Sequence, residues 1–188
     1  MSLSKPVFNF LGFYFEQLHT NPVKTKSITS CVIATLGNLT SQYLSGVKVI
    51  NQDSLIAYGM FGLLFGGSVP HYFYRALDHY ISDDVALAPV KQLILERLIF
   101  MPLFQILALY MLARLEGKSQ QQAAKQLSQL YWPVVIANWK WLSLLQFVNF
   151  TFVHPMLRVL VANMIGFVWI VYMANKRRQS RDQRGSRQ

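Results

Sequence analysis

Five long runs of this sequence contain no charged side chain. They cover residues 27–47, 54–74, 98–113, 141–157 and 159–175. A helix of roughly 20 apolar residues crosses the hydrocarbon core of a bilayer, and each run is close to that length. Helices of soluble proteins usually carry charge on the face turned to water, so such runs are unusual in a soluble domain. The distribution of charge therefore predicts helices that lie in lipid.

The overall composition agrees with a membrane protein. Of the 188 residues, 53% are hydrophobic and 14% are charged, whereas soluble domains carry about 25% charged residues. The formal net charge is +10, but lysine and arginine flank the apolar runs and form no patch interleaved with aromatic residues. We therefore expect a lipid bilayer as partner and no nucleic acid.

We expect one all-α membrane domain over residues 1–175, folded as an integral membrane helical bundle. An amphipathic helix at residues 6–20 lies against the membrane in this interpretation, because its apolar side chains recur at helical spacing. Four predicted transmembrane helices follow, near residues 28–47, 54–74, 92–113 and 158–175. Residues 75–89 contain several aspartates and are predicted to form an exposed connection.

Two segments complete this plan. Residues 134–155 are predicted either to be embedded in the membrane or to form a further span, entered at Trp132-Pro133 after a surface helix that begins with the capping pair Ser119 and Gln122. The count of lysine and arginine on the two sides favours an even number of spans, with both termini in the cytosol. Residues 176–188 are basic and are predicted to be disordered.

Small residues in the first two spans indicate close helix packing. In the second span, Gly62 and Gly66 form a GxxxG spacing, and Gly59 lies three residues before Gly62. Gly37 is in the first span. A helix with glycine on one face can approach another helix closely in lipid. We expect these four glycines to be packing positions.

Polar amides within the apolar segments are the candidate site residues. They are Asn38, Gln42, Gln146, Asn149 and Asn163. Gln146 and Asn149 are three residues apart and share a helix face. These amides either line a wet path or form a polar bundle interior that joins helix to helix, and the sequence leaves both readings open.

Three charged residues lie at the edges of the predicted spans: Glu96, Arg97 and Arg158. Ionisable groups in a membrane mark functional sites by default, so these residues are expected to set charge selectivity or to form structural ion pairs. Adjacent residues on an α-helix do not face one another, so Glu96 and Arg97 are each expected to find a partner elsewhere or to reach the headgroups.

The sequence contains no pattern typical of an enzyme. We find no paired carboxylates on one span and no HExxH motif, and one cysteine excludes a cysteine-based metal cluster. His71 and His79 have no further ligand types at metal-binding spacing. We expect no catalytic residue, no metal and no cofactor.

The final third of the chain carries a recognisable motif, which begins at Asn138-Trp139 and continues through Gln146, Asn149-Phe150, Arg158 and Asn163. With Pro70-His71-Tyr72 and Leu95-Glu96-Arg97, it resembles a family of small four-span proteins of the peroxisomal and mitochondrial inner membranes. The resemblance implies a multi-pass protein of the peroxisomal membrane that assembles as a homo-oligomer and forms a pore, which passes small water-soluble metabolites with weak selectivity. The alternatives are a non-conducting membrane scaffold and a mitochondrial inner-membrane channel of the same family.

Overall fold

The computed structural model describes residues 4–82, 84–169 and 171, with side chains from residue 8 onward. Helices joined by short connections make up this part of the chain, and it contains no strand. The predicted basic tail at 176–188 and the end of the span predicted at 158–175 lie outside the described residues.

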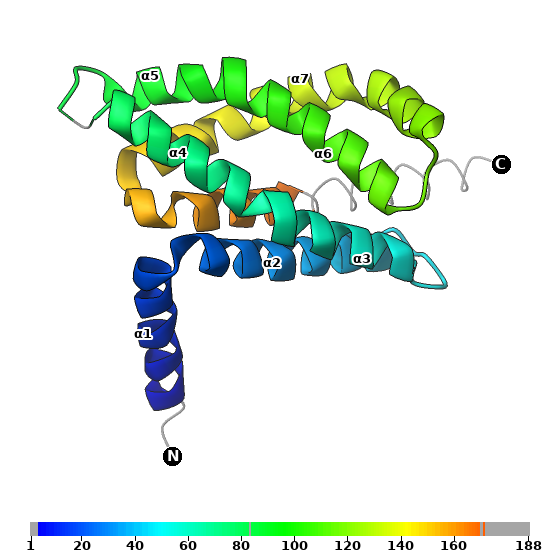
Figure 1. Cartoon of the computed structure of the whole chain (residues 1–188), viewed down its shortest axis with the longest axis horizontal. Coiled ribbons are helices and arrows are strands. Elements are labelled where there is room, and N and C mark those ends of the chain that lie inside the picture. The colour runs from blue at the N-terminus through cyan, green and yellow to red at the C-terminus, as the bar shows by residue number, and fades with distance from the viewer. Residues whose placement is uncertain (1–3, 83, 170, 172–188) are drawn as a thin grey trace, which may run out of the picture.

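Helix α1 (Ser4–Thr20) projects from one end of the bundle, and α2 (Pro22–Leu44) is one of its long helices (Figure 1). Asn21 separates the two, and Pro22 suits the first position of α2 because its missing N–H would have no helical partner there. Leu18 is buried at the junction, and the Tyr14 and Thr29 hydroxyls lie 3.2 Å apart. The base of α1 is therefore fixed to α2.

We call each long, nearly continuous stretch of helix a rod, and α2 is the first. The second rod consists of α3 (Gln52–Phe61), a π-helical segment η1 (Gly62–Gly66) and α4 (Ser68–Tyr80). The Asn51 side chain caps α3 by accepting a hydrogen bond from the Ser54 backbone N–H. The rod continues beyond Pro70 to Tyr80, so the first part of the segment predicted as an exposed connection is helical. Pro70 would clash with the carbonyl of Gly66 in a regular α-helix, and the wider turn of η1 ends at that residue.

The third rod contains α5 (Ala88–Leu95), a second π-helical segment η2 (Glu96–Phe100) and α6 (Met101–Leu115). In the described part of the chain, Ala88–Leu115 is the one helix long and apolar enough to cross a membrane, and Pro155–Trp169 is a shorter apolar helix. Only 11% of the most apolar stretch of Ala88–Leu115 is buried. The core helix of a soluble protein would be mostly buried, so this rod is placed as a lipid-facing helix would be.

Helix α7 (Gln120–Phe152) is longer than the sequence indicates. Its capping box is confirmed, since the Ser119 hydroxyl accepts from the Gln122 N–H and the Gln122 side chain accepts from the Ser119 N–H. The sequence separates a surface helix from a membrane segment at Pro133, but α7 passes through Pro133 as one helix. The short 3₁₀ turn η3 (Pro155–Leu157) then reverses the chain into a final helix, described over residues 158–169.

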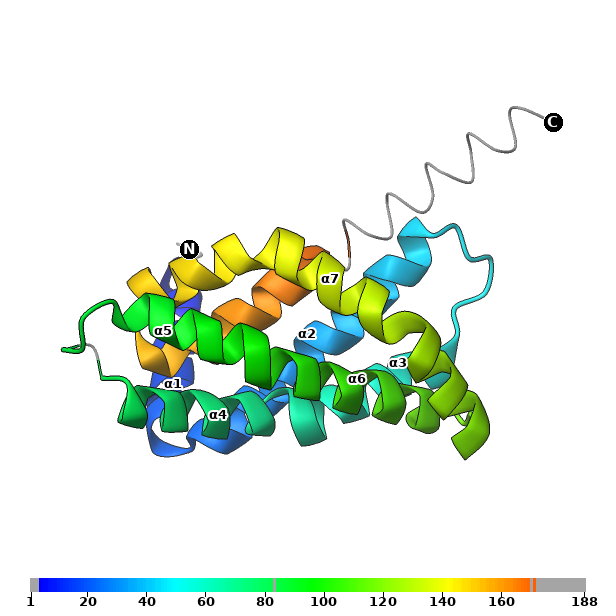
Figure 2. The same ribbon diagram turned by 90° about the horizontal axis from the view of Figure 1, so that it is seen from above.

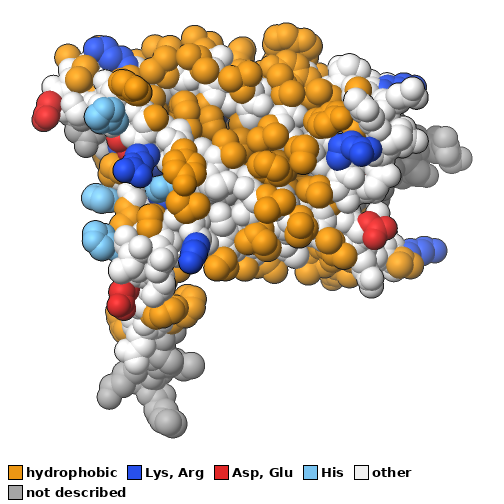
Figure 3. Space-filling model, viewed as in Figure 1, with side chains coloured by type: hydrophobic (Ala, Val, Ile, Leu, Met, Phe, Trp, Pro, Cys, Tyr) orange, Lys and Arg blue, Asp and Glu red, His pale blue; other side chains and the backbone are white. Residues whose placement is uncertain are grey.

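The rods lie side by side, and the final helix runs between α7 and α2 (Figures 1 and 2). The four predicted spans correspond to α2, the α3–η1–α4 rod, the α5–η2–α6 rod and the final helix, and α7 packs along the third rod. Hydrophobic side chains cover much of the face seen in Figure 3. In the described part of the chain, Leu98, Leu103, Ile136 and Leu144 are among the large hydrophobic residues that are more than half exposed.

Glycine contacts hold α2 against the second rod. A Cβ atom added at Gly62 would lie 2.6 Å from the Ser30 carbonyl oxygen, and one at Gly59 would lie 2.8 Å from the Thr35 hydroxyl. At Gly67, which the sequence analysis does not count as a packing position, an added Cβ would overlap the backbone of Ser27. At Gly66 the nearest atom would be the Ser30 Cβ at 3.4 Å, and Gly37 is buried on the facing helix.

Candidate functional site

A cavity of about 260 Å³ lies between the helices of the bundle. All the long helical rods contribute to its wall, including both π-helical segments. The polar residues of the wall are Ser30, Tyr74, Glu96, Arg97, Gln105, Asn138, Gln146 and Asn163. Polar groups therefore gather inside the bundle, whereas large apolar side chains face outward.

The wall of the cavity contains the charged pair of η2. Arg97 Nε lies 2.9 Å from Glu96 Oε2, and neither atom makes a hydrogen bond among the residues described. The prediction that each residue needs a separate partner is wrong for Glu96, because its carboxylate lies against the guanidinium of the adjacent Arg97. Arg97 also donates to Asn138 Oδ1, and the Trp139 Nε1–H donates to the Arg97 carbonyl at 3.0 Å.

Two of the predicted amides reach the cavity. The Gln146 side chain is 3% exposed and donates to the Tyr74 hydroxyl at 2.9 Å. The Asn163 side chain donates to the Ser30 hydroxyl at 2.6 Å, which joins the final helix to α2. Both residues line the cavity, and both also link helices. These positions therefore fit a wet path and a polar bundle interior equally well.

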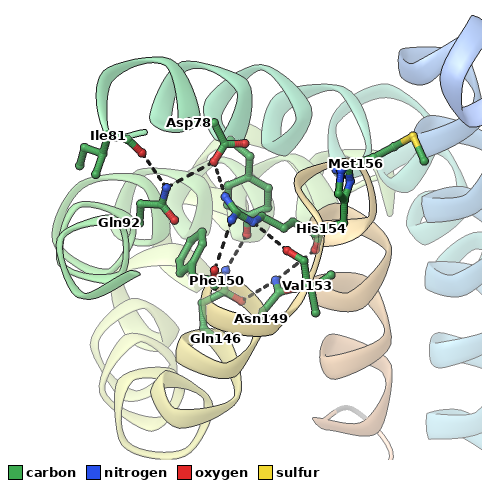
Figure 4. Close-up of polar contacts among 11 residues, drawn as sticks. Asp78, Ile81, Gln92, Gln146, Asn149, Phe150, Val153, His154 and Met156 are labelled. Carbon is green, nitrogen blue, oxygen red and sulfur yellow. Dashed lines mark hydrogen bonds and ion pairs between the residues drawn. The ribbon is translucent and has the colours of Figure 1, made fainter. Parts of the chain in front are cut away.

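Asn149 and Arg158 are not on the cavity wall and belong to a second polar cluster. Figure 4 shows Asn149 in this cluster, close to Gln146 and Phe150. Asn149 is fully buried and donates to the Arg158 carbonyl at 3.2 Å. The Arg158 guanidinium is 2% exposed in its side chain and forms an ion pair with Asp78. It also donates to the carbonyl oxygens of Phe150 at 3.2 Å and Val153 at 3.3 Å.

Asp78 belongs to this second polar cluster, although its position in the sequence does not predict that. The sequence places it in an exposed connection at 75–89, but α4 extends to Tyr80, and Asp78 lies on it within ion-pair distance of Arg158. Gln92 Nε2 lies 3.4 Å from Asp78 Oδ1 and donates to the Ile81 carbonyl at 2.9 Å (Figure 4). Asp78 and Arg158 are 80 residues apart in the sequence, so no local sequence pattern indicates that they form an ion pair.

Asn38 and Gln42 lie in a third polar cluster, outside the wall of the central cavity. Gln42 donates to Asn38 Oδ1 at 2.7 Å and accepts from the Asn51 backbone N–H at 2.7 Å. Asn38 donates to the Ser54 hydroxyl, which in turn donates to Glu116 at 3.0 Å. This cluster joins α2 and α3 to the end of α6, at the end of the bundle opposite η3 (Figure 1).

Histidine, cysteine and acidic side chains do not gather into a metal-binding group anywhere in the part of the chain that was described. Cys31 is a free thiol on α2.

A family model described as the Mpv17 / PMP22 family matches residues 113–174. Peroxisomal membrane protein 2 of Bos taurus is 30% identical to this chain over 172 residues, which cover 88% of each protein. The chain belongs to the Mpv17/PMP22 family. The segment matched by the family model contains all of α7 and the described part of the final helix, with Gln146, Asn149, Arg158 and Asn163.

Two further Mpv17/PMP22 relatives widen the comparison. PXMP2/4 family protein 3 of Dictyostelium discoideum is 31% identical over 178 residues, covering 93% of this chain and 96% of the relative. A protein of Caenorhabditis elegans named mitochondrial inner membrane protein Mpv17 is 24% identical, covering 86% of this chain and 90% of the relative. No solved structure is detectably similar to this chain.

Proposed function

We propose that this chain is a multi-pass protein of the peroxisomal membrane that lets small water-soluble metabolites pass through its central cavity. The observation that carries the proposal is a cavity of about 260 Å³ between the helices, with polar and charged groups among the apolar residues of its wall, in a bundle that exposes many large apolar side chains on its outside. That volume corresponds to about nine water molecules at roughly 30 Å³ each. A solute with a few heavy atoms therefore fits.

The membrane placement rests on two supports. Helix Ala88–Leu115 is long and apolar enough to cross a bilayer and is mostly unburied. The bovine relative is named a peroxisomal membrane protein, which favours that organelle. In this proposal the four predicted spans cross the bilayer, α7 lies beside them, and α1 rests at the interface. The mitochondrial inner membrane is the alternative, since the nematode relative is named for it.

The second candidate function is a non-conducting membrane scaffold. It is favoured by the polar groups of the cavity wall, several of which bond to one another. Gln146 donates to Tyr74, Asn163 donates to Ser30, and Arg97 donates to Asn138. In the scaffold these hydrogen bonds only hold helix to helix, and no solute passes.

A bulky side chain at Gly166 distinguishes the pore from the non-conducting scaffold. Gly166 lines the cavity, and a Cβ atom added there would have no neighbour within 4 Å. The Gly166→Trp variant therefore adds an indole at the cavity wall, and its Cβ meets no backbone there. We expect proteoliposomes containing the unmodified chain to take up small polar solutes, with uptake falling as solute size increases, and the Gly166→Trp variant to lower that uptake at least tenfold.

The matched control is Gly12→Trp. Gly12 is also free of neighbours within 4 Å of an added Cβ, but it lies on α1 and not on the cavity wall. Uptake should be unchanged in this variant. Uptake that is absent from the unmodified chain, in several lipid mixtures, supports the scaffold instead. Uptake that is insensitive to Gly166→Trp excludes this cavity as the path.

A further inference from the structure

A second recess, of about 280 Å³, lies where α1, α2, α4 and η3 meet. Its charged and histidine lining residues are His19, Lys26, His71, Arg75 and Asp78. Figure 3 shows that basic and histidine side chains gather at this end of the molecule, where α1 joins the bundle. The recess and the central cavity share Tyr74 as a wall residue. A ligand in the recess would therefore lie next to the cavity.

Lys26 is the most unusual residue of the recess because it is a buried cation. The residue is 6% exposed, and its Nζ lies 3.1 Å from His71 Nδ1. No carboxylate of the described residues comes within ion-pair distance of it. Lys26 precedes the span predicted at 28–47. Burial of its ammonium group lowers its pKa, and the charge of Asp78 acts in the opposite direction. A bound anion would supply the missing countercharge.

The one carboxylate of the recess is already engaged. Asp78 forms the ion pair with Arg158 and lies next to Gln92. Arg158 lies outside the recess and neutralises Asp78, so the lining keeps the two cationic groups of Lys26 and Arg75 beside a carboxylate that is already paired. Arg75 and His19 are exposed, so the recess is open to a ligand from solution or from the membrane surface.

We propose that this recess binds a phosphate group, with Lys26 and Arg75 as its charged ligands and His71 as a hydrogen-bonding partner. A lysine ammonium binds phosphate as a compact charge, and an arginine offers two parallel N–H donors to phosphate oxygens. A charged ammonium has only donors, so His71 Nδ1 accepts from Lys26 and the Nε2–H remains as a donor. The volume exceeds that of one phosphate, which leaves room for the carbon skeleton of a phosphate ester or a phospholipid headgroup.

Binding of inorganic phosphate and of glycerol 3-phosphate to the full chain, purified in a non-ionic detergent, tests this proposal by titration calorimetry. We expect Lys26→Met and Arg75→Gln each to weaken binding at least tenfold. Arg75 is exposed, so its variant tests the site even if Lys26→Met folds poorly. The matched control is Lys24→Met, which removes an exposed lysine two residues away on α2 and should leave binding unchanged.

A second measurement separates the two sources of phosphate. The chain is reconstituted in phosphatidylcholine vesicles with or without phosphatidic acid, and retained lipid is identified after extraction. Retention of phosphatidic acid that depends on Lys26 and Arg75 supports a lipid headgroup, whereas binding of glycerol 3-phosphate with no such retention supports a soluble ester.

The proposal is overturned by either of two results. One is the absence of phosphate binding in both measurements. The other is an equal loss in Lys24→Met and Lys26→Met, which would show only the general attraction of a chain with net charge +10. Binding is measured without transport, and Gly166→Trp should not alter it. A protein that binds phosphate but does not conduct would therefore refute the pore and leave the recess intact.

Discussion

The guanidinium of Arg158 is held by groups from two other parts of the chain, namely Asp78 on α4 and the carbonyls of Phe150 and Val153 at the end of α7. The apolar setting of Arg158 is visible in the sequence, and it predicts a site that is either charge-selecting or structural. The partner is not visible, because Asp78 precedes Arg158 by 80 residues and stands among other aspartates. The described contacts fit a structural ion pair, and charge selection at Arg158 stays a prediction.

Neutralising Asp78 should therefore destabilise the bundle. Removing one partner of a fully buried ion pair costs about 3 to 5 kcal/mol. The Asp78 side chain is 26% exposed, so we expect Asp78→Asn to lower the unfolding free energy by a smaller amount, about 2 kcal/mol. Scanning calorimetry in detergent measures the change as a lower Tm. Asp84→Asn is the control, since Asp84 is exposed, and equal Tm values for the two variants would contradict the role given to the ion pair.

Helix position follows from the sequence more readily than helix shape does. Charge-free runs locate α2 and the second and third rods because the membrane requires apolar length, which is a local property. The π-helical segments η1 and η2 are harder to predict from the sequence, although Pro70 and Pro102 follow them and mark where a regular helix is disturbed. Pro133 lies inside α7 with no such segment, so proline alone does not predict the outcome.

The GxxxG spacing predicts a close contact between helices, but it does not predict which of the two glycines makes that contact. Both glycines face α2 of the same chain, but an added Cβ would lie 2.6 Å from backbone at Gly62 and 3.4 Å from a side chain at Gly66. We expect Gly62→Ala to lower the unfolding free energy by about 1 to 3 kcal/mol, because backbone must move, and Gly66→Ala to change it by less than about 1 kcal/mol. Chemical denaturation in detergent compares the two, and equal effects would contradict the close approach.

At the scale of the whole molecule, polar and charged groups stand among apolar side chains on the wall of an internal cavity, and many large apolar side chains are exposed on the exterior. Large contiguous apolar surfaces are uncommon on soluble monomeric proteins and mark contact with a membrane or a partner. The chain also has a net charge of +10, and a basic protein can adhere to an anionic membrane surface without entering it. The two modes of attachment differ in their response to salt.

Attachment by charge weakens as salt rises, because the Debye length falls from about 10 Å at 0.1 M to about 3 Å at 1 M. Burial of apolar side chains in lipid is not screened in this way. We therefore expect the protein to stay with the membrane pellet in molar salt and in alkaline carbonate, and to be released only by detergent. A peripheral protein of the same membranes serves as the control and should be released by both washes. Release of this chain by salt alone would show that its exposed apolar helices, Ala88–Leu115 above all, do not lie in the bilayer.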